Sequence, residues 1–272
     1  MTKPILPKRL YHYTTAAGLR GIIEENAFHA GNYRFLNDET EIHHGMEVVS
    51  QSLAARFPLG LDKSYAPFQW EQMIEFTEVW VVCFSELRDD LNQWRSYGRP
   101  GGDRYCIALD RTLLKAEVGS HHFTRPQWLR VMYTSNEKSR VIRRICAEER
   151  IRPSKKSATQ GSITLDLKLY MMLPAFKEAS FAAEKEWRFV IYQRPRYPRY
   201  EDGTPVQFKE SGGHLTPYLT VAPEDGKLPI AEVLFLPRRG GSLQCETVAR
   251  LLLDGRGYRG DIVRRSSIPF VD

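Results

Sequence analysis

Apolar residues occur in short runs along the chain, and the strongest of these runs predict strands. Val79–Ser85 is an almost continuous apolar segment, which indicates a strand buried on both faces. Arg104–Asp110 alternates well enough to be its sheet partner, and Trp187–Tyr192 is another strong strand. Further strands are predicted at Leu10–Thr14, Tyr33–Leu36, Leu129–Tyr133, Tyr218–Val221 and Ile230–Leu236, with a last extended segment at Ile262–Val271.

Segments with helical spacing lie between these strands. Leu19, Ile22 and Ile23 form an apolar stripe after Thr15, which is a suitable N-cap, and Gly31-Asn32 predicts a turn. Other helices are predicted from Asp38 or Thr40 to Phe57 and at Phe68–Phe76, Asp89–Tyr97, Asn136–Arg152, Thr164–Phe181 and Ser242–Asp254. Strands and helices do not alternate regularly, so we expect an α+β fold with a mostly antiparallel sheet.

Length and composition place limits on this fold. The 272 residues fit one domain spanning 1–272, with helical insertions at 58–78 and 134–162. No apolar run is long enough for a bilayer, and no signal-peptide stretch precedes residue 10, so we expect a cytoplasmic protein without a membrane partner. The four cysteines are far apart, which predicts neither a zinc site nor a disulfide framework.

Basic side chains occur in two runs, and the net charge is +6. Tyrosines are interleaved with the second run, as in surfaces that bind nucleic-acid backbones and bases. The alternative is a solvated helix followed by a polar loop. The two runs comprise Arg140, Arg143, Arg144, Arg150, Arg152, Lys155 and Lys156, and then Arg194, Arg196 and Arg199.

Four local clusters combine residues that can carry chemistry, and each also has a purely structural interpretation. His12 can be a strand residue bonded to a carbonyl, Ser85 can simply end a strand, and Glu186 can pair with Arg188 or Lys185. Asp38 can cap a helix. The clusters are Tyr11-His12-Tyr13-Thr14, Asn37-Asp38-Glu39 with Glu41, Ser85 with Gln93-Trp94 and Tyr97-Gly98, and Glu184-Lys185-Glu186-Trp187-Arg188.

Taken together, these clusters resemble the ADP-ribosyltransferase superfamily. Its fold is a split, mostly antiparallel sheet that clasps NAD⁺, with a His, a Ser or Tyr, and a Glu on three separate strands. His12, Ser85 and Glu186 occur in that order, and Glu186 ends an ExE pattern. Most of the chain also resembles an uncharacterised bacterial family with YHYT, NDxxE, FSE…W…Y and EKEWR elements and a SxIP ending, here Ser266–Pro269.

The resemblance implies a role for each residue. Glu186, with Glu184 as the alternative carboxylate, would stabilise the cationic sugar formed when the nicotinamide–ribose bond breaks, while His12 and Ser85 would hold the ribose. A tyrosine would stack on nicotinamide and a cation would meet the pyrophosphate. The implied NAD⁺ contacts are Tyr11, His12, Tyr13, Thr14, Ser85, Trp94, Arg95 and Tyr97, and the implied acceptor contacts are Asn37, Asp38 and Glu184.

The resemblance therefore predicts an ADP-ribosyltransferase that uses NAD⁺ and no metal, with His12, Ser85 and Glu186 converging at one cleft. Its acceptor would be a protein or a nucleic acid. A bacterial toxin or anti-phage defence effector, neutralised by an antitoxin protein, is the implied context. The alternatives are an NAD⁺ glycohydrolase, in which water is the acceptor, and a non-catalytic nucleic-acid-binding module that uses the basic runs.

Overall fold

The computed structural model describes most of the chain, and its described strands form one sheet centred on β3 (Glu78–Ser85). The described residues are 7–36, 41–56, 77–97, 102–110, 116–117, 126–148, 159–193, 206–211, 213–237 and 241–269. One edge of β3 pairs along its whole length with β7 (Glu186–Gln193), antiparallel, so that Ser85 lies opposite Glu186. This pairing brings two distant predicted site residues together.

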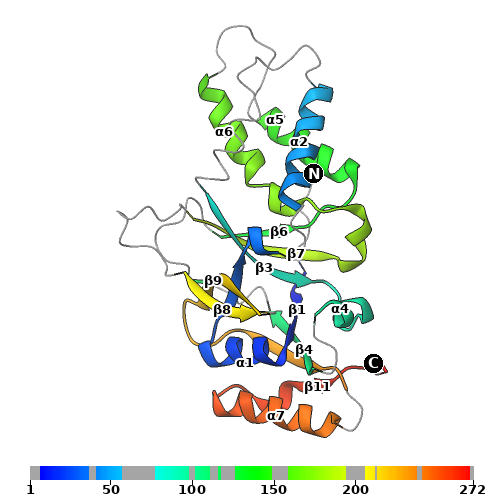
Figure 1. The fold of residues 1–272 in the computed structure, drawn as a ribbon, viewed down its shortest axis with the longest axis vertical. Coiled ribbons are helices and arrows are strands. Elements are labelled where there is room, and N and C mark those ends of the chain that lie inside the picture. The colour runs from blue at the N-terminus through cyan, green and yellow to red at the C-terminus, as the bar shows by residue number, and fades with distance from the viewer. Residues whose placement is uncertain are drawn as a thin grey trace.

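The other edge of β3 is shared by two strands that separate from each other. β1 (Arg9–Thr15) pairs with β3 through Tyr11 and Ser85, whereas β2 (Phe28–Asn32) pairs with it through Gly31 and Asn32, near the opposite end. The intervening part of β3 therefore faces a fork between β1 and β2. Figure 1 shows β1 and β3 running in clearly different directions at this point.

Further strands extend the sheet beyond both arms of the fork. The sheet order is β11-β10-β4-β1-β3-β2-β9-β5, with β6 added to β7 and β8 to β9. All of these pairings are antiparallel except that of β10 with β11. The bounds are β4 Arg104–Asp110, β5 Ala116–Glu117, β6 Gln127–Arg130, β8 Gln207–Ser211, β9 His214–Pro223, β10 Ile230–Phe235 and β11 Val263–Arg265.

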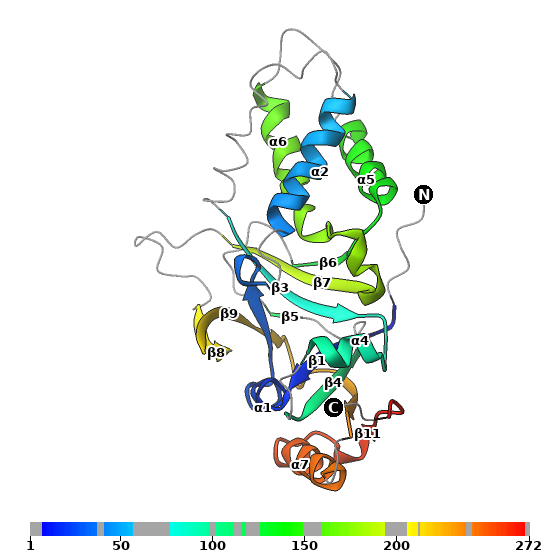
Figure 2. The same ribbon diagram turned by 45° about the vertical axis from the view of Figure 1, so that its right-hand side comes forward.

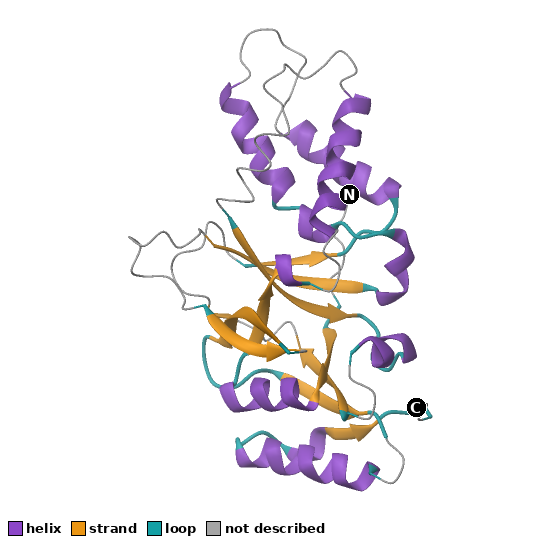
Figure 3. Ribbon diagram, viewed as in Figure 1, coloured by secondary structure: helices purple, strands orange, loops and turns teal. Residues whose placement is uncertain are grey.

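Helices lie at both ends of the molecule, with the sheet between them (Figure 3). At one end, α2 (Glu41–Arg56), α5 (Ser135–Glu148) and α6 (Thr159–Tyr170) stand together above β6 and β7 (Figure 2). Their apolar residues pack on the face of β3 and β7 that carries Val81 and Val190. At the other end, α1 (Ala16–Glu25) and α7 (Ser242–Gly255) cover a second core that contains Phe84 and Trp187.

The alternation of side chains along β3 and β7 explains these two cores. Neighbouring residues of a strand point to opposite faces, so Phe84 and Trp187 enter one core while Ser85 and Glu186 lie on the other face. Both strands are nearly fully buried, which their continuous apolar sequence predicts. The candidate site lies at the ends of these two strands.

The α+β class and the mostly antiparallel sheet are confirmed, but some predicted elements are wrong. Gly31-Asn32 belongs to β2 and not to a turn, and Tyr33–Phe35 is a 3₁₀ turn instead of a strand. The helix predicted at Thr164–Phe181 ends at Tyr170, and 3₁₀ turns follow at Leu173–Ala175 and Ala179–Glu184. A further 3₁₀ turn spans Gly260–Ile262.

Some predictions fall outside the described residues. These include the amphipathic stretch Phe68–Phe76 and most of the proposed insertion at 58–78. Within the described part of the chain, none of the helices has both the length and the apolar character needed to cross a membrane.

Candidate functional site

A buried ion-pair network lies at the start of β7. Glu186 and Arg188 are two residues apart on one strand, so both side chains point to the same face. Arg188 Nε donates to Glu186 Oε1 at 2.7 Å, and Arg188 Nη2 donates to Glu186 Oε2 at 3.1 Å. Arg188 also binds the Glu41 carboxylate of α2, with Nη1 and Oε2 2.7 Å apart. These three side chains are almost fully buried.

A lysine extends this network towards a third carboxylate. Lys177 Nζ lies 3.1 Å from Glu186 Oε2, 2.6 Å from Glu184 Oε2 and 3.4 Å from Glu41 Oε1. Three carboxylates thus share two cations, which leaves one formal negative charge in the cluster if all are ionised. Glu184 has 29% of its side chain exposed, whereas those of Glu41 and Glu186 are at most 6% exposed. Glu184 is therefore the carboxylate of the three with the most access to solvent.

The environment separates the pKa values of the two neighbouring glutamates. Burial opposes ionisation of Glu186, but the charges of Arg188 and Lys177 outweigh it and lower the pKa of Glu186 to about 2. Burial raises the pKa of Glu184, and the hydrogen bond and charge of Lys177 only partly offset this effect. At neutral pH Glu186 is therefore ionised, while Glu184 takes up a proton more easily than Glu186 does.

A backbone kink lies between the two glutamates that bind Lys177. Lys185 has φ 46°, in the left-handed region that residues with a side chain seldom occupy. This conformation ends the 3₁₀ turn Ala179–Glu184 and starts β7 immediately afterwards. Lys185 is held there because its carbonyl accepts a hydrogen bond from the Glu86 amide at 3.1 Å. Strain of this kind in a tightly held segment is common at functional sites.

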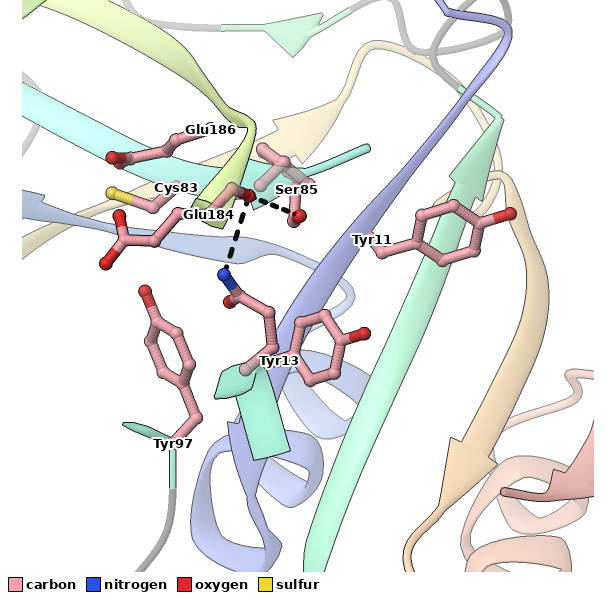
Figure 4. Close-up of a pocket in the computed structure, with 9 residues that line it drawn as sticks. Tyr11, Tyr13, Cys83, Ser85, Tyr97, Glu184 and Glu186 are labelled. Carbon is pink, nitrogen blue, oxygen red and sulfur yellow. Dashed lines mark hydrogen bonds between the residues drawn. The ribbon is translucent and has the colours of Figure 1, made fainter. Parts of the chain in front are cut away.

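Ser85 fixes the same segment from the opposite strand. Its hydroxyl donates to the Glu184 carbonyl at 2.6 Å and accepts from the Leu87 amide at 3.1 Å. Ser85 thus positions the backbone that carries Glu184. Figure 4 shows this bond, with Glu184, Glu186 and Cys83 side by side and the hydroxyl end of Tyr97 pointing towards Glu184. Burial raises the pKa of the Cys83 thiol well above its usual value, so this cysteine is neutral.

These residues line a small pocket with room for about one water molecule. Its far wall comes from the helix α4 (Leu91–Ser96), which contributes Gln93, and from Tyr97 directly after it. Gln93 Nε2 donates a long hydrogen bond of 3.5 Å to the Glu184 carbonyl. The pocket is lined by Tyr11, Tyr13, Cys83, Phe84, Ser85, Gln93, Tyr97, Glu184 and Glu186.

The structure brings Ser85 and Glu186 together but places His12 elsewhere, so the expected convergence of all three side chains at one cleft is not found. His12 lies between Tyr11 and Tyr13 on β1 and therefore points to the opposite face. Its ring lies in the fork between β1 and β2, against Phe28 and Phe84, and donates from Nδ1 to the Cys83 carbonyl at 2.8 Å. Burial lowers the pKa of His12 to about 4, so the ring is neutral at pH 7.

Of the other residues that the resemblance assigns to the site, some line the pocket and others do not. Tyr11, Tyr13 and Tyr97 line the pocket, whereas Thr14 does not. Trp94 is fully buried in a core cluster with Tyr13, and its Nε1 donates to Asp89 at 2.7 Å. Arg95 is exposed on α4, away from the pocket lining. Asn37 and Asp38 lie outside the described residues, as does much of the basic runs.

Lys177 and Cys83 were not predicted to belong to the site, and Gln93 was named only as a member of the cluster with Ser85 and Trp94. Arg188 was predicted only as a possible structural partner of Glu186, which the structure confirms it to be. Two opposite charges at alternate positions of an otherwise apolar strand are the signal for this pair. Glu41 is marked only as the last residue of the NDxxE element, and no signal marks Lys177, because the partners of both residues lie on other elements.

The site offers no evident cage for a metal. No group of three or more potential His, Cys, Asp or Glu ligands comes together within the described ranges. The carboxylates at the pocket are instead occupied by Lys177 and Arg188.

Comparison with known proteins covers part of this site. The sequence model of a family described as a protein of unknown function, DUF2971, matches residues 93–189, about a third of the chain. The match begins at Gln93 and contains Lys177, Glu184, Glu186 and Arg188, but neither β1 nor β3. No significant match was found among curated proteins or among solved structures. The chain is thus similar to this family over one pocket wall and over all of the ion-pair network except Glu41.

Proposed function

We propose that the protein cleaves the nicotinamide–ribose bond of NAD⁺ and transfers ADP-ribose to a macromolecular acceptor. The observation that carries the proposal is the pair Glu184 and Glu186, which line one pocket while their pKa values shift in opposite directions. Carboxylates separated in this way are typical of sites where one stays ionised and the other exchanges a proton.

Each carboxylate has a distinct part in the proposed reaction. Loss of nicotinamide leaves positive charge on the ribose, as in glycoside hydrolysis, and Glu186 supplies a fixed negative charge beside it. Glu184, which is more exposed and has a raised pKa, accepts the proton of the incoming nucleophile. Ser85 fixes the Glu184 backbone, so in this proposal it positions a reacting group and does not react itself.

The mostly antiparallel sheet is compatible with the resemblance, but the fork between β1 and β2 is filled by the rings of His12, Phe28 and Phe84 and does not hold the nucleotide in this proposal. The pocket itself has room for about one water molecule, so the proposal requires Gln93 and Tyr97 to turn aside when the nicotinamide ring enters. His12 lies on the opposite face, and its contact with the ribose is therefore not part of the proposal. The acceptor, and the toxin or defence context with its antitoxin, stay predictions from the resemblance.

NAD⁺ glycohydrolysis is a second candidate, because the Glu184 side chain is partly exposed and water can therefore reach it as the acceptor. A single water beside Glu184 would be placed to attack the ribose, with Glu184 as the base. Labelled NAD⁺ separates the two reactions, because transfer places the label on a macromolecule whereas hydrolysis leaves it in free ADP-ribose. A nucleic-acid-binding module would give neither product.

Replacement of each glutamate tests the proposal. Glu186→Gln should lower the rate of nicotinamide release from NAD⁺ by about 10²–10⁴-fold, because the charge beside the cationic sugar is lost. Glu184→Gln should lower it by less. Glu148→Gln, a substitution at an exposed ion pair on α5, is the matched control and should keep full turnover. Wild-type turnover in folded Glu186→Gln, or no nicotinamide release by the wild type in a cell lysate, would refute the proposal.

A further inference from the structure

The carboxylate of Asp89 is the centre of a clasp between the C-terminal segment and the pocket wall. Ser266 Oγ donates to Asp89 Oδ1 at 2.6 Å, and the Ser267 amide and hydroxyl both donate to Asp89 Oδ2 at 2.8 Å. Trp94 Nε1 also donates a hydrogen bond to Asp89 Oδ1, at 2.7 Å. Burial opposes ionisation of Asp89, but the hydrogen bonds from Ser266, Trp94 and Ser267 outweigh it and lower its pKa.

The C-terminal side of this clasp is itself fixed to the sheet. Ser266 is buried, and its amide donates to the Phe235 carbonyl of β10 at 2.9 Å. Its hydroxyl also accepts from the Ile268 amide, and Ile268 packs against the cluster that contains Tyr13 and Trp94. The Ser-x-Ile-Pro ending thus connects a rigid part of the sheet to the residues around Asp89. Figure 1 places the C-terminal end of the chain on the same side of the molecule as α4.

The other side of the clasp is a helix that depends on external contacts. α4 has six residues, and a helix this short is not stable by itself. It is held by its Asp90 N-cap, by the burial of Trp94 and by the bond from Trp94 to Asp89. Gln93 on α4 and Tyr97 directly after it form the wall of the pocket opposite the glutamates. A shift of α4 would therefore move that wall.

We propose that Asp89, through its bonds to Ser266 and Ser267, is a positioning residue that sets the place of Gln93 and Tyr97 over the pocket. Asp89 does not line the pocket and acts through Trp94 and α4. The C-terminal segment, which no step of the proposed reaction uses, thereby determines how closed the pocket is. The position of this wall is independent of the reaction, whereas its effect on turnover rests on the proposed function.

Cys83 provides a direct readout of the wall. It lines the pocket and is partly exposed, while Cys106, Cys146 and Cys245 are buried. Asp89→Asn should raise the rate at which a small maleimide labels Cys83 by about tenfold or more, because charged hydrogen bonds to the clasp are lost. Peptide mass spectrometry identifies the labelled cysteine. Ser267→Ala should have a smaller effect, and Ser267→Thr, which keeps the hydroxyl at this exposed position, should restore the wild-type rate.

Asp254→Asn is the matched control. Asp254 also accepts a backbone amide, that of Gly260 at 2.8 Å, but at the end of α7 and away from the pocket lining. The Asp254→Asn substitution should leave the rate of Cys83 labelling unchanged. Equal labelling in Asp89→Asn and the wild type, or equal acceleration by Asp254→Asn, would overturn the proposal. If NAD⁺ is turned over, Asp89→Asn should lower kcat several-fold and Asp254→Asn should not. Without turnover the labelling result still decides the role of the clasp.

Discussion

Replacing Arg188 by Met tests whether the ion-pair network contributes to stability. The Arg188 side chain is 1% exposed, and it binds Glu186 through two nitrogens, Glu41 through Nη1 and the Pro174 carbonyl at 2.9 Å. Met fills much of the same volume but supplies neither charge nor donors. The change leaves Glu41 and Glu186 buried with Lys177 as their shared cation.

Two arguments give the size of the effect. Removing one partner of a buried ion pair typically costs about 3–5 kcal/mol. Arg188 and Lys177 together lower the pKa of Glu186 from its ordinary value of 4.5 to about 2, which corresponds to about 3 kcal/mol of stability at neutral pH. We therefore expect Arg188→Met to lower the free energy of unfolding at pH 7 by about 3–5 kcal/mol, as measured by urea denaturation.

The pH dependence provides an independent check. In the wild type the depressed pKa of Glu186 contributes stability that is present above about pH 4.5 and is lost as pH falls towards 2. In Arg188→Met, burial still raises the pKa of Glu186 while the charge of Arg188 that lowers it is gone, so acidification from pH 7 to pH 5 should narrow the difference in the free energy of unfolding from the wild type. A loss below about 1 kcal/mol at pH 7, or a difference that does not change at pH 5, would refute this reasoning.

A surface arginine provides the matched control. Arg20 pairs with Glu24 four residues later on α1, at 3.7 Å, and its side chain is 70% exposed. Such pairs contribute about 0.5 kcal/mol or less, so Arg20→Met should leave the urea midpoint almost unchanged. A comparable loss in both variants would show that the effect does not depend on burial of the charge.

Two further predictions concern β1. Burial lowers the pKa of His12 in the folded protein to about 4, so the neutral ring contributes stability that is complete above about pH 6.5 and is lost as pH falls towards 4. An NMR titration should therefore find the ring unprotonated at pH 5. A titration midpoint near pH 6.5 would contradict the burial of His12. Tyr13→Phe should cost about 1–3 kcal/mol in urea denaturation, because the hydroxyl donates to the Leu87 carbonyl and accepts from the Asp90 amide. Tyr11→Phe is its control, and an equal loss there would show that these two bonds contribute little.

The parts of the fold that the sequence predicts best are those where local pattern and burial agree. Val79–Ser85 was predictable because an apolar run that long has few alternatives to a buried strand. Phe28–Asn32 was not, because Gly31 and Asn32 favour a turn locally, and only pairing with both β3 and β9 makes them a strand. Gln207–Ser211 is a polar strand whose pairing is with β9, and its sequence carries little strand signal.

The same contrast between local pattern and contacts between distant elements explains which site residues could be predicted. Alternation along β7 places Glu186 and Arg188 on one face, so their ion pair follows from spacing alone. By the same rule Tyr11 and Tyr13 share one face of β1 and His12 lies on the other, so the three predicted NAD⁺ contacts cannot all line one pocket. Lys177 and Glu41 reach the network from separate elements, and no local pattern reports contacts of that kind.

A buried ion network is by itself weak evidence for function, because such networks often contribute little net stability. This network, however, is asymmetric. Glu41 and Glu186 are enclosed, with their oxygens facing Arg188 and Lys177, whereas Glu184 is partly exposed, touches only Lys177 among the cations of the described residues and lines the pocket. The excess negative charge is therefore balanced most easily at Glu184, by a proton or by a cationic substrate group. A purely structural network would have no need to keep one carboxylate accessible beside a strained residue and a pocket.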